Sequence, residues 1–202
     1  MTWAHLFLAT FAVLAVLDWV AVARQWRSVE YVAKPGALLA LLGYAITGKG
    51  ASAWLLAALA CSLLGDVLLM LPRDLFIAGL LAFFAAHLAY VVAIPGALAS
   101  RLVWFAVVLV ATAPISTRLL RAVSNVALRG GVAAYMVVIA AMVSSALASG
   151  IGSAAAGALF FLASDTLLAW NRFVGPFAGA RVAIMVTYHL AQLGLATALR
   201  FD

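Results

Sequence analysis

Apolar stretches follow one another along almost the whole chain and are separated only by short polar or glycine- and proline-containing links. The 202 residues are 68% hydrophobic and 9% charged, with a mean hydropathy of +1.21. Soluble domains are roughly 45–50% apolar and about 25% charged, so a water-soluble globule could not bury this much apolar surface. The runs are continuous and do not alternate with polar residues, which disfavours a membrane barrel. The sequence predicts an all-α integral membrane protein.

A helix needs about 20 mostly apolar residues to cross a bilayer, so a chain of 202 residues is expected to form a bundle of about eight spans and no soluble domain. We expect a single transmembrane domain over residues 1–202, with a retained first span instead of a cleaved signal peptide. Pro35 is expected to open the second span after a polar link, because proline suits the first helical turn. The expected spans are residues 3–23, 35–47, 52–71, 75–94, 102–115, 132–148, 153–170 and 181–199.

Basic residues gather on one side of this eight-span layout. Nine basic residues lie in the links after the first, third, fifth and seventh spans, namely Arg24, Arg27, Lys34, Arg73, Arg118, Arg121, Arg129, Arg172 and Arg181. Three lie on the other side, namely Lys49, Arg101 and Arg200. The positive-inside rule places the nine in the cytoplasm and both termini outside. The net charge of +6 thus reflects topology and not nucleic-acid binding. Frequent Ala, Leu, Val and Arg suggest a bacterial inner-membrane protein.

Two aspartates interrupt the apolar spans. Asp66 and Asp165 each lie about five residues before the end of a span that runs from outside to inside. A charged side chain at mid-span costs at least ~2.5–3.5 kcal/mol, so such residues are rare without a function. At 1.5 Å per residue, both carboxylates should lie roughly 7–8 Å inside the cytoplasmic boundary. Lys34 and Asn171 are expected in the same layer.

Other polar residues of the spans have both functional and structural interpretations. His87 and Tyr90 are one helical turn apart on one face, as are Tyr188 and Gln192. Either pair could serve a site or form interhelical hydrogen bonds. The two aspartates could simply pair with Lys34 or with snorkelling arginines. Asp18, near a span end beside Trp19, is expected to be structural, and Trp19 to lie in the interfacial aromatic belt.

A weak internal repeat accompanies the aspartates. Residues 65–69 (Gly-Asp-Val-Leu-Leu) resemble residues 164–168 (Ser-Asp-Thr-Leu-Leu), 99 positions later. This offset corresponds to four spans, so the bundle could consist of two parallel four-helix repeats. The chain contains no metal-finger spacing, and its one cysteine, Cys61, lies in an apolar run. No metal or cofactor is expected.

Two carboxylates in a site of low dielectric constant can divide labour, one as a general acid and the other as a base. This pairing suits hydrolysis through an oxocarbenium-like state, and it also suits aspartyl peptide hydrolysis. The segment before Asp66 lacks the two-glycine pattern of intramembrane aspartyl proteases, and no Tyr-Asp pair or Pro-Ala-Leu segment is present. A transporter or lipid-binding protein that uses the aspartates as a proton relay or counter-charge is the alternative to an enzyme.

Residues spread from position 31 to position 192 resemble the YhhN-type lysoplasmalogenase family of multi-span membrane proteins. The resemblance is carried by Lys34-Pro35 after Tyr31, by the segment 62–66 (Ser-Leu-Leu-Gly-Asp) with Leu69, by Phe76, Gly79, Phe83, His87 and Tyr90, by Tyr135, by Gly157, Phe160, Ser164, Asp165 and Asn171, and by Tyr188 and Gln192. It implies about eight spans and a hydrolase that cleaves the vinyl-ether bond of lysoplasmalogens to a fatty aldehyde and glycerophospho-ethanolamine or -choline.

The resemblance also implies roles for individual residues. It makes Asp66 and Asp165 the catalytic pair. The expected substrate-binding residues are Lys34, His87, Tyr90, Tyr135, Ser164, Asn171, Tyr188 and Gln192. A protonated aspartate, by slight preference Asp165, would protonate the vinyl carbon, while the other would activate water or stabilise the cation. Lys34 and nearby arginines would hold the lysophospholipid phosphate. A related ether lipid is an equally open substrate, and the sequence does not indicate protein partners or an oligomeric state.

Overall fold

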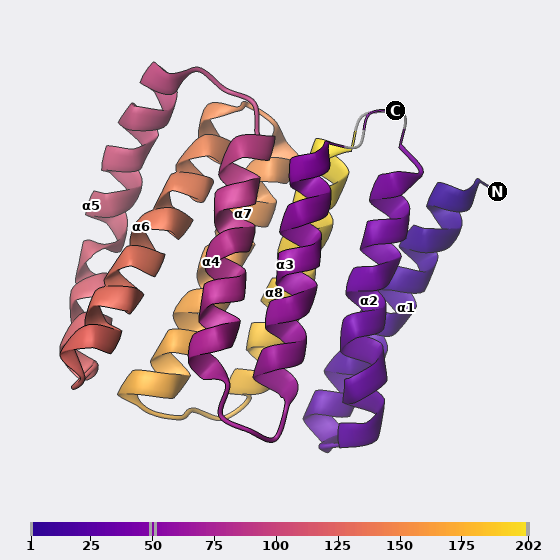
Figure 1. The fold of residues 1–202 in the computed structure, drawn as a ribbon, viewed down its shortest axis with the longest axis horizontal. Coiled ribbons are helices and arrows are strands. Elements are labelled where there is room, and N and C mark those ends of the chain that lie inside the picture. The colour runs from indigo at the N-terminus through magenta and orange to yellow at the C-terminus, as the bar shows by residue number, and fades with distance from the viewer. Residues whose placement is uncertain (1, 49, 51, 201–202) are drawn as a thin grey trace.

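The structure is a computed structural model that describes residues 2–48, 50 and 52–200, and in it eight long α-helices cross the molecule in alternating directions (Figure 1). All eight are long and apolar enough to span a membrane. The expected helical bundle of about eight spans is therefore confirmed. The elements are α1 (Trp3–Arg24), α2 (Arg27–Ile46), α3 (Ala53–Met70), α4 (Phe76–Ala93), α5 (Leu98–Ala122), α6 (Val126–Ala148), α7 (Gly152–Ala169), the π-helical turn η1 (Trp170–Val174) and α8 (Ala180–Leu199).

Consecutive helices pair as antiparallel hairpins. The turns α1–α2, α3–α4, α5–α6 and α7–α8 all lie at one end of the bundle, while the start of α1 and the end of α8 lie at the other (Figure 1). Helix α8 contacts α1, α2, α3 and α7, whereas α5 lies at the edge and contacts mainly α6. Of the basic residues used in the topology prediction, Lys49 lies outside the described residues. The nine expected on one side all belong to the end with the four hairpin turns.

Helix α2 begins earlier than the sequence predicts. It starts at Arg27, so the expected polar link over residues 27–34 is helical and Pro35 lies inside the helix, not in its first turn. A proline removes only one backbone hydrogen bond, and surrounding packing can compensate for that loss in a membrane helix. The first turns of α2 are anchored because Glu30 and Lys34 are buried against the bundle. Helices α5 and α6 likewise extend past the expected spans, since their polar ends remain helical beyond the apolar segment.

Small residues set the closest helix contacts. A Cβ atom added at Gly157 on α7 would lie 2.8 Å from the backbone nitrogen of Leu195 on α8, and one at Gly194 would lie 2.8 Å from the Cα of Gly157. A Cβ at Gly65 on α3 would lie 2.6 Å from the ring of Phe83 on α4. Small residues let membrane helices approach closely where apolar side chains alone give little drive to associate. These contacts fix the rotation of α3 and α7, the two helices that carry the aspartates.

An aromatic cluster joins α4, α7 and α8 at the centre of the bundle. Phe161 is fully buried, and its ring centroid lies 4.6 Å from that of His87, 5.7 Å from that of Tyr188 and 6.1 Å from that of Phe83. The preceding Phe160, which carries part of the family resemblance, is instead 40% exposed. Phe161 therefore packs between two side chains that, as described below, each contact a different aspartate.

The end of α7 differs from the simple turn that the sequence predicts. Residues 170–174 continue the helix as the π-helical turn η1, in which Gly175 N–H donates to the carbonyl of Trp170 at 3.0 Å. Such turns are rare and occur often at functional sites. The extra turn places Arg172 and Phe173 against Phe76 at the start of α4, where the Phe173 and Phe76 rings pack edge to face and the Arg172 guanidinium lies 4.9 Å from the Phe76 ring centroid.

Candidate functional site

A polar cavity of about 460 Å³ opens at the end of the bundle that carries the four hairpin turns. Its wall is built by α2, α3, α4, α7, η1 and α8 together with the α3–α4 link. Six residues expected from the sequence line it: Lys34, Asp66, Ser164, Asp165, Asn171 and Tyr188. Lys34, Asp66, Asp165 and Asn171, which are predicted to share one layer, all line this cavity.

Asp66 lies in a charged and hydrogen-bonded environment. Its Oδ1 lies 3.1 Å from Lys34 Nζ on α2, and its Oδ2 accepts a hydrogen bond of 2.6 Å from the Tyr188 hydroxyl on α8. Asp66 and Lys34 are both buried. A buried ion pair with an added hydrogen bond meets the conditions under which two charges are tolerated away from water. Asp66 therefore has an ion-pair partner on α2 and a hydrogen-bond donor on α8.

Asp165 lies in a neutral environment. Its Oδ2 accepts a hydrogen bond of 2.5 Å from the Tyr135 hydroxyl on α6 and lies 3.7 Å from His87 Nε2 on α4. The other ring nitrogen of His87 lies 2.6 Å from the Phe83 carbonyl. A carbonyl can only accept, so His87 Nδ1 carries a proton, and in the neutral imidazole Nε2 is an acceptor that faces Asp165. No Lys or Arg forms an ion pair with Asp165 among the described residues.

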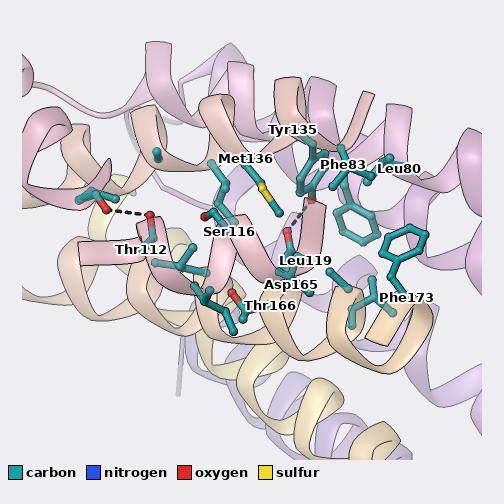
Figure 2. A pocket seen from close by; sticks show the side chains of 18 of the residues that line it. Leu80, Phe83, Thr112, Ser116, Leu119, Tyr135, Met136, Asp165, Thr166 and Phe173 are labelled. Carbon is teal, nitrogen blue, oxygen red and sulfur yellow. Dashed lines mark hydrogen bonds between the residues drawn. The ribbon is translucent and has the colours of Figure 1, made fainter. Parts of the chain in front are cut away.

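Asp165 also borders a second, apolar space. A slot of about 70 Å³ lies between α4, α5, α6 and α7, and Figure 2 shows Asp165 and its bond to Tyr135 beside Met136, Leu119 and Ser116. The slot extends along α5 as far as Thr112 and Val108. Asp165 lines both the slot and the polar cavity, as do Leu69, Phe76, Phe83 and Leu168. The carboxyl group therefore stands where a polar and an apolar space meet.

The two aspartates have matching surroundings in the two halves of the chain. Asp66 on α3 contacts Lys34 on α2 and Tyr188 on α8, whereas Asp165 on α7 contacts Tyr135 on α6 and His87 on α4. Moving each helix by four places along the chain converts α2 into α6 and α3 into α7. Counting on from α8 to α1 in the same way converts α8 into α4. The corresponding side chains are 99 to 101 positions apart. Each aspartate thus contacts one group from its own half and one from the last helix of the other half, as expected for parallel repeats.

Charged side chains surround the mouth of the polar cavity. Arg172 pairs with Asp74 at 2.6 Å, and Arg181 pairs with Glu30 at 2.6 Å. The hydrogen bond from Arg172 lowers the pKa of the exposed Asp74 carboxyl. Arg73 also lines the cavity, and no ion pair involving it occurs among the described residues. The mouth therefore presents a cation that can meet an anionic group.

Four of the residues expected to bind substrate have side chains that are occupied elsewhere or that do not line the cavity. The Tyr90 hydroxyl donates to Gln192 Oε1 at 2.6 Å, so these two residues form an interhelical pair and line neither the polar cavity nor the slot. Ser164 lines the cavity, although its hydroxyl donates to the Ile184 carbonyl. His87 lines neither space, but it lies 3.7 Å from Asp165 and its ring packs edge to face against that of Tyr135.

Several charged or polar residues near the site were not predicted from the sequence. Glu30, expected in a loop, is buried in the cavity wall, and its spacing of four residues from Lys34 would have placed both on one helical face. Asp18, expected to be structural, is fully buried within α1. Trp19, expected in the aromatic belt, donates instead to His189 Nδ1 at 2.9 Å. The described residues hold no cluster of three His, Cys, Asp or Glu side chains suited to a metal ion.

Comparison with known proteins identifies similar membrane proteins. The model of the YhhN family matches residues 29–199, a range that includes both aspartates. The chain is 40% identical over 152 residues to "Lysoplasmalogenase TMEM86B" of Sus scrofa, covering 72% of this chain and 63% of the relative. The Homo sapiens protein of the same name is 39% identical over 142 residues, covering 67% and 58%.

The protein of the same name from Mus musculus is 35% identical over 188 residues, covering 89% of this chain and 79% of the relative. The chain therefore spans less than two thirds of the pig and human relatives and more of the mouse protein. No solved structure matches the chain.

Proposed function

This chain belongs to the YhhN family, and on that premise we propose that it is a membrane hydrolase that cleaves the vinyl-ether bond of lysoplasmalogen or a related single-chain ether lipid. The relatives named lysoplasmalogenase support this choice of substrate class. The observation that carries the proposal is the position of Asp165 between a polar cavity and an apolar slot. The scissile bond of such a lipid likewise lies between a polar head group and a hydrocarbon chain.

The two spaces suggest how the substrate lies. The alkenyl chain occupies the slot beside α5, and the glycerophospho head group occupies the polar cavity. Arg73 meets the phosphate at the cavity mouth, because Lys34 is already paired with Asp66. Arginine can bind phosphate through two hydrogen bonds. Arg73→Gln should raise KM several-fold and leave kcat near the wild-type value, whereas Arg24→Gln, at the same end but outside the cavity, should change neither. An unchanged KM for Arg73→Gln would contradict this placement.

Asp165 is the general acid in the proposed reaction. None of the described Lys or Arg side chains forms an ion pair with it to hold it as a carboxylate, and the neutral His87 Nε2, 3.7 Å away, adds no positive charge beside it. The proton passes from Asp165 to the vinyl carbon farther from the ether oxygen. The carbon bonded to that oxygen then becomes an oxocarbenium ion. Asp165 is left as a carboxylate, which the Tyr135 hydroxyl stabilises through its hydrogen bond.

Asp66 completes the reaction as the ionised partner. Lys34 and Tyr188 hold it as a carboxylate, which stabilises the cation and accepts a proton from the attacking water. The water oxygen bonds to the cationic carbon and gives a hemiacetal. Asp66 then gives its proton to the departing alkoxide oxygen and Asp165 takes the hydroxyl proton of the hemiacetal, so that the C–O bond breaks to a fatty aldehyde and the glycerophospho-alcohol. Both aspartates regain their starting protonation, and one water is consumed for each ether bond broken.

The experiment that tests the function compares three lysolipids that differ only in the bond between the hydrocarbon chain and glycerol. One is a vinyl ether, one a saturated ether and one an acyl ester. The purified protein should release aldehyde from the vinyl-ether lipid and release no product from the saturated ether or the acyl ester. In heavy water the aldehyde should carry one deuterium next to its carbonyl carbon, because that carbon receives the proton from Asp165. Release of a fatty acid from the ester, without aldehyde from the vinyl ether, would refute the proposed activity.

Transport is the alternative that the matching halves of the chain favour. Parallel repeats with polar groups at their interface occur in transporters, and the contacts of Asp66 and Asp165 follow such a pattern. Proteoliposomes assayed in parallel for aldehyde release and for proton or lysolipid flux distinguish the two functions. Flux that persists when aldehyde release is absent would favour transport.

We infer that the polar cavity faces the cytoplasm and that both termini lie outside, in a bacterial inner membrane. The support is the concentration of basic residues at the cavity end. With Cys61 replaced by serine, a membrane-impermeant maleimide should label Ala97→Cys in intact cells. It should label Ala178→Cys, in the α7–α8 link, only after the cells are permeabilised. The reverse pattern would overturn this orientation.

A further inference from the structure

A groove between α4 and α6 opens on the outer surface of the bundle, on the far side of the slot wall. It has a volume of about 490 Å³ and is lined from α4 by Ile77, Leu81 and Phe84 and from α6 by Leu128 and Gly131. Ile77 and Leu81 are each more than 60% exposed. None of the described residues that line the groove is charged. Asn125, the N-cap of α6, lines the groove at the end nearest the α5–α6 turn. In a membrane-spanning bundle, the apolar remainder of such a surface faces lipid chains.

The groove is separated from the proposed active site by one layer of side chains. Leu80 and Tyr135 line both the groove and the apolar slot. The Tyr135 hydroxyl donates to Asp165 Oδ2 at 2.5 Å. Figure 2 shows Leu80, Phe83 and Tyr135 together on the side of the slot next to Asp165. A hydrocarbon chain in the slot and one in the groove would therefore contact opposite sides of the same two residues.

Two consecutive residues of α6 beside the groove have no side chain. Gly130 and Gly131 lie in the second turn of α6, and a Cβ atom at either would meet nothing within 4 Å. Neither glycine has a positive φ, and glycine lowers helix stability by about 1 kcal/mol relative to alanine. Close helix packing, which explains Gly157, does not explain Gly131. The missing side chain at Gly131 instead keeps the groove wide.

We propose that the groove is the route by which the fatty aldehyde leaves the slot and enters the bilayer. This inference rests on the proposed function. Hydrolysis yields two products of opposite polarity: the glycerophospho-alcohol can leave through the polar cavity, and the aldehyde has only a hydrocarbon chain and one carbonyl. An uncharged single chain can pass an apolar opening that a phosphate cannot. Displacement of the Leu80 and Tyr135 side chains joins the slot to the groove.

A matched pair of glycine variants tests the route. Gly131→Leu fills the groove, whereas Gly130→Leu makes the same chemical change at a neighbouring exposed position that does not line it. Product release limits turnover in many enzymes. We expect Gly131→Leu to lower kcat several-fold for a hexadecenyl lysolipid and to leave kcat for a butenyl lysolipid unchanged, because a short aldehyde is soluble enough to leave through the polar cavity. Gly130→Leu should leave both unchanged.

Equal loss of turnover on both chain lengths, or no loss on either, would overturn the route. A second measurement is independent of catalysis: a fatty aldehyde carrying a diazirine is photolysed with wild-type protein in vesicles, and labelled peptides are mapped. Labels should fall on Ile77, Leu81 and Leu128 and be lost in Gly131→Leu. Labels confined to other lipid-facing positions would contradict the proposal. If the wild-type protein releases no aldehyde from either substrate, the proposed function fails, and the labelling still decides whether the groove binds a chain.

Discussion

Asp66 and Asp165 occupy corresponding positions in the two halves of the molecule, yet their surroundings differ in charge. The group supplied by the preceding helix is the Lys34 ammonium for Asp66 and the Tyr135 hydroxyl for Asp165. The group supplied by the other half is the Tyr188 hydroxyl for Asp66 and the His87 imidazole for Asp165. One scaffold thus holds one carboxyl group in an ion pair and the other among neutral groups. The difference shows that two aspartates at corresponding positions can have surroundings of different charge.

The largest expected contrast is in stability. Asp66→Asn leaves the Lys34 ammonium buried without its ion-pair partner, and breaking a buried pair in this way costs about 3–5 kcal/mol. Asp165→Asn breaks no pair with a lysine or arginine, and its amide oxygen can still accept from Tyr135, so the cost should be below about 1 kcal/mol. Unfolding of both variants in the same detergent measures the difference. Equal stabilities would remove the distinction between the two environments.

The next largest effect is the coupling between Lys34 and Asp66. Lys34→Met alone leaves a buried carboxylate, whereas Lys34→Met with Asp66→Asn leaves no charge in the pair. The double variant should therefore be more stable than either single variant, with a coupling energy of about 0.5–3 kcal/mol. The same double-mutant cycle applied to Tyr135→Phe and Asp165→Asn should give a smaller coupling energy. Additive effects of Lys34→Met and Asp66→Asn would show that the ion pair does not hold Asp66.

The smallest effect distinguishes the two tyrosines. Tyr188→Phe removes a hydrogen bond to an ionised acceptor, worth about 1.5–3 kcal/mol, and Tyr135→Phe removes one to a neutral acceptor, worth about 0.5–1.5 kcal/mol. Thermal unfolding should rank Tyr188→Phe as the less stable, with Tyr31→Phe as the control because Tyr31 is exposed on α2. The reverse order would indicate that Asp165, and not Asp66, carries the charge.

Much of the fold could be predicted from hydropathy. A bilayer requires apolar spans of a fixed length, and it requires every backbone polar group within it to be hydrogen-bonded inside the protein, which favours helices. The same topology gave Asp66 and Asp165 a common depth, and the structure places both in one cavity. Depth depends only on the distance of a residue from its span end. For that reason the layer could be predicted without knowledge of helix packing.

The partners of each aspartate could not be predicted, because they depend on how each helix is rotated about its axis. That rotation is set by contacts such as Gly65 against Phe83 and Gly157 against Gly194. Small and apolar residues are common throughout this sequence, so these particular contacts do not stand out. The sequence predicts Glu30 in a link because Pro35, five positions later, favours a helix start, whereas α2 begins at Arg27. The structural role expected for Asp18 does not define where its carboxyl group lies, and the packing of α1 against α2 and α8 buries it.

Aldehyde release from lysoplasmalogen by purified, folded Asp165→Asn and Asp66→Asn, each compared with wild type, tests most directly whether two aspartates divide the chemistry. Asp74→Asn, an exposed aspartate in the α3–α4 link at the cavity mouth, is the control. Loss of a general acid typically costs about 10²–10⁴ in rate. We predict losses in that range for both variants, with Asp165→Asn retaining the wild-type fold, and near-normal rates for Asp74→Asn. Near-normal turnover by either Asp165→Asn or Asp66→Asn would contradict the two-aspartate mechanism.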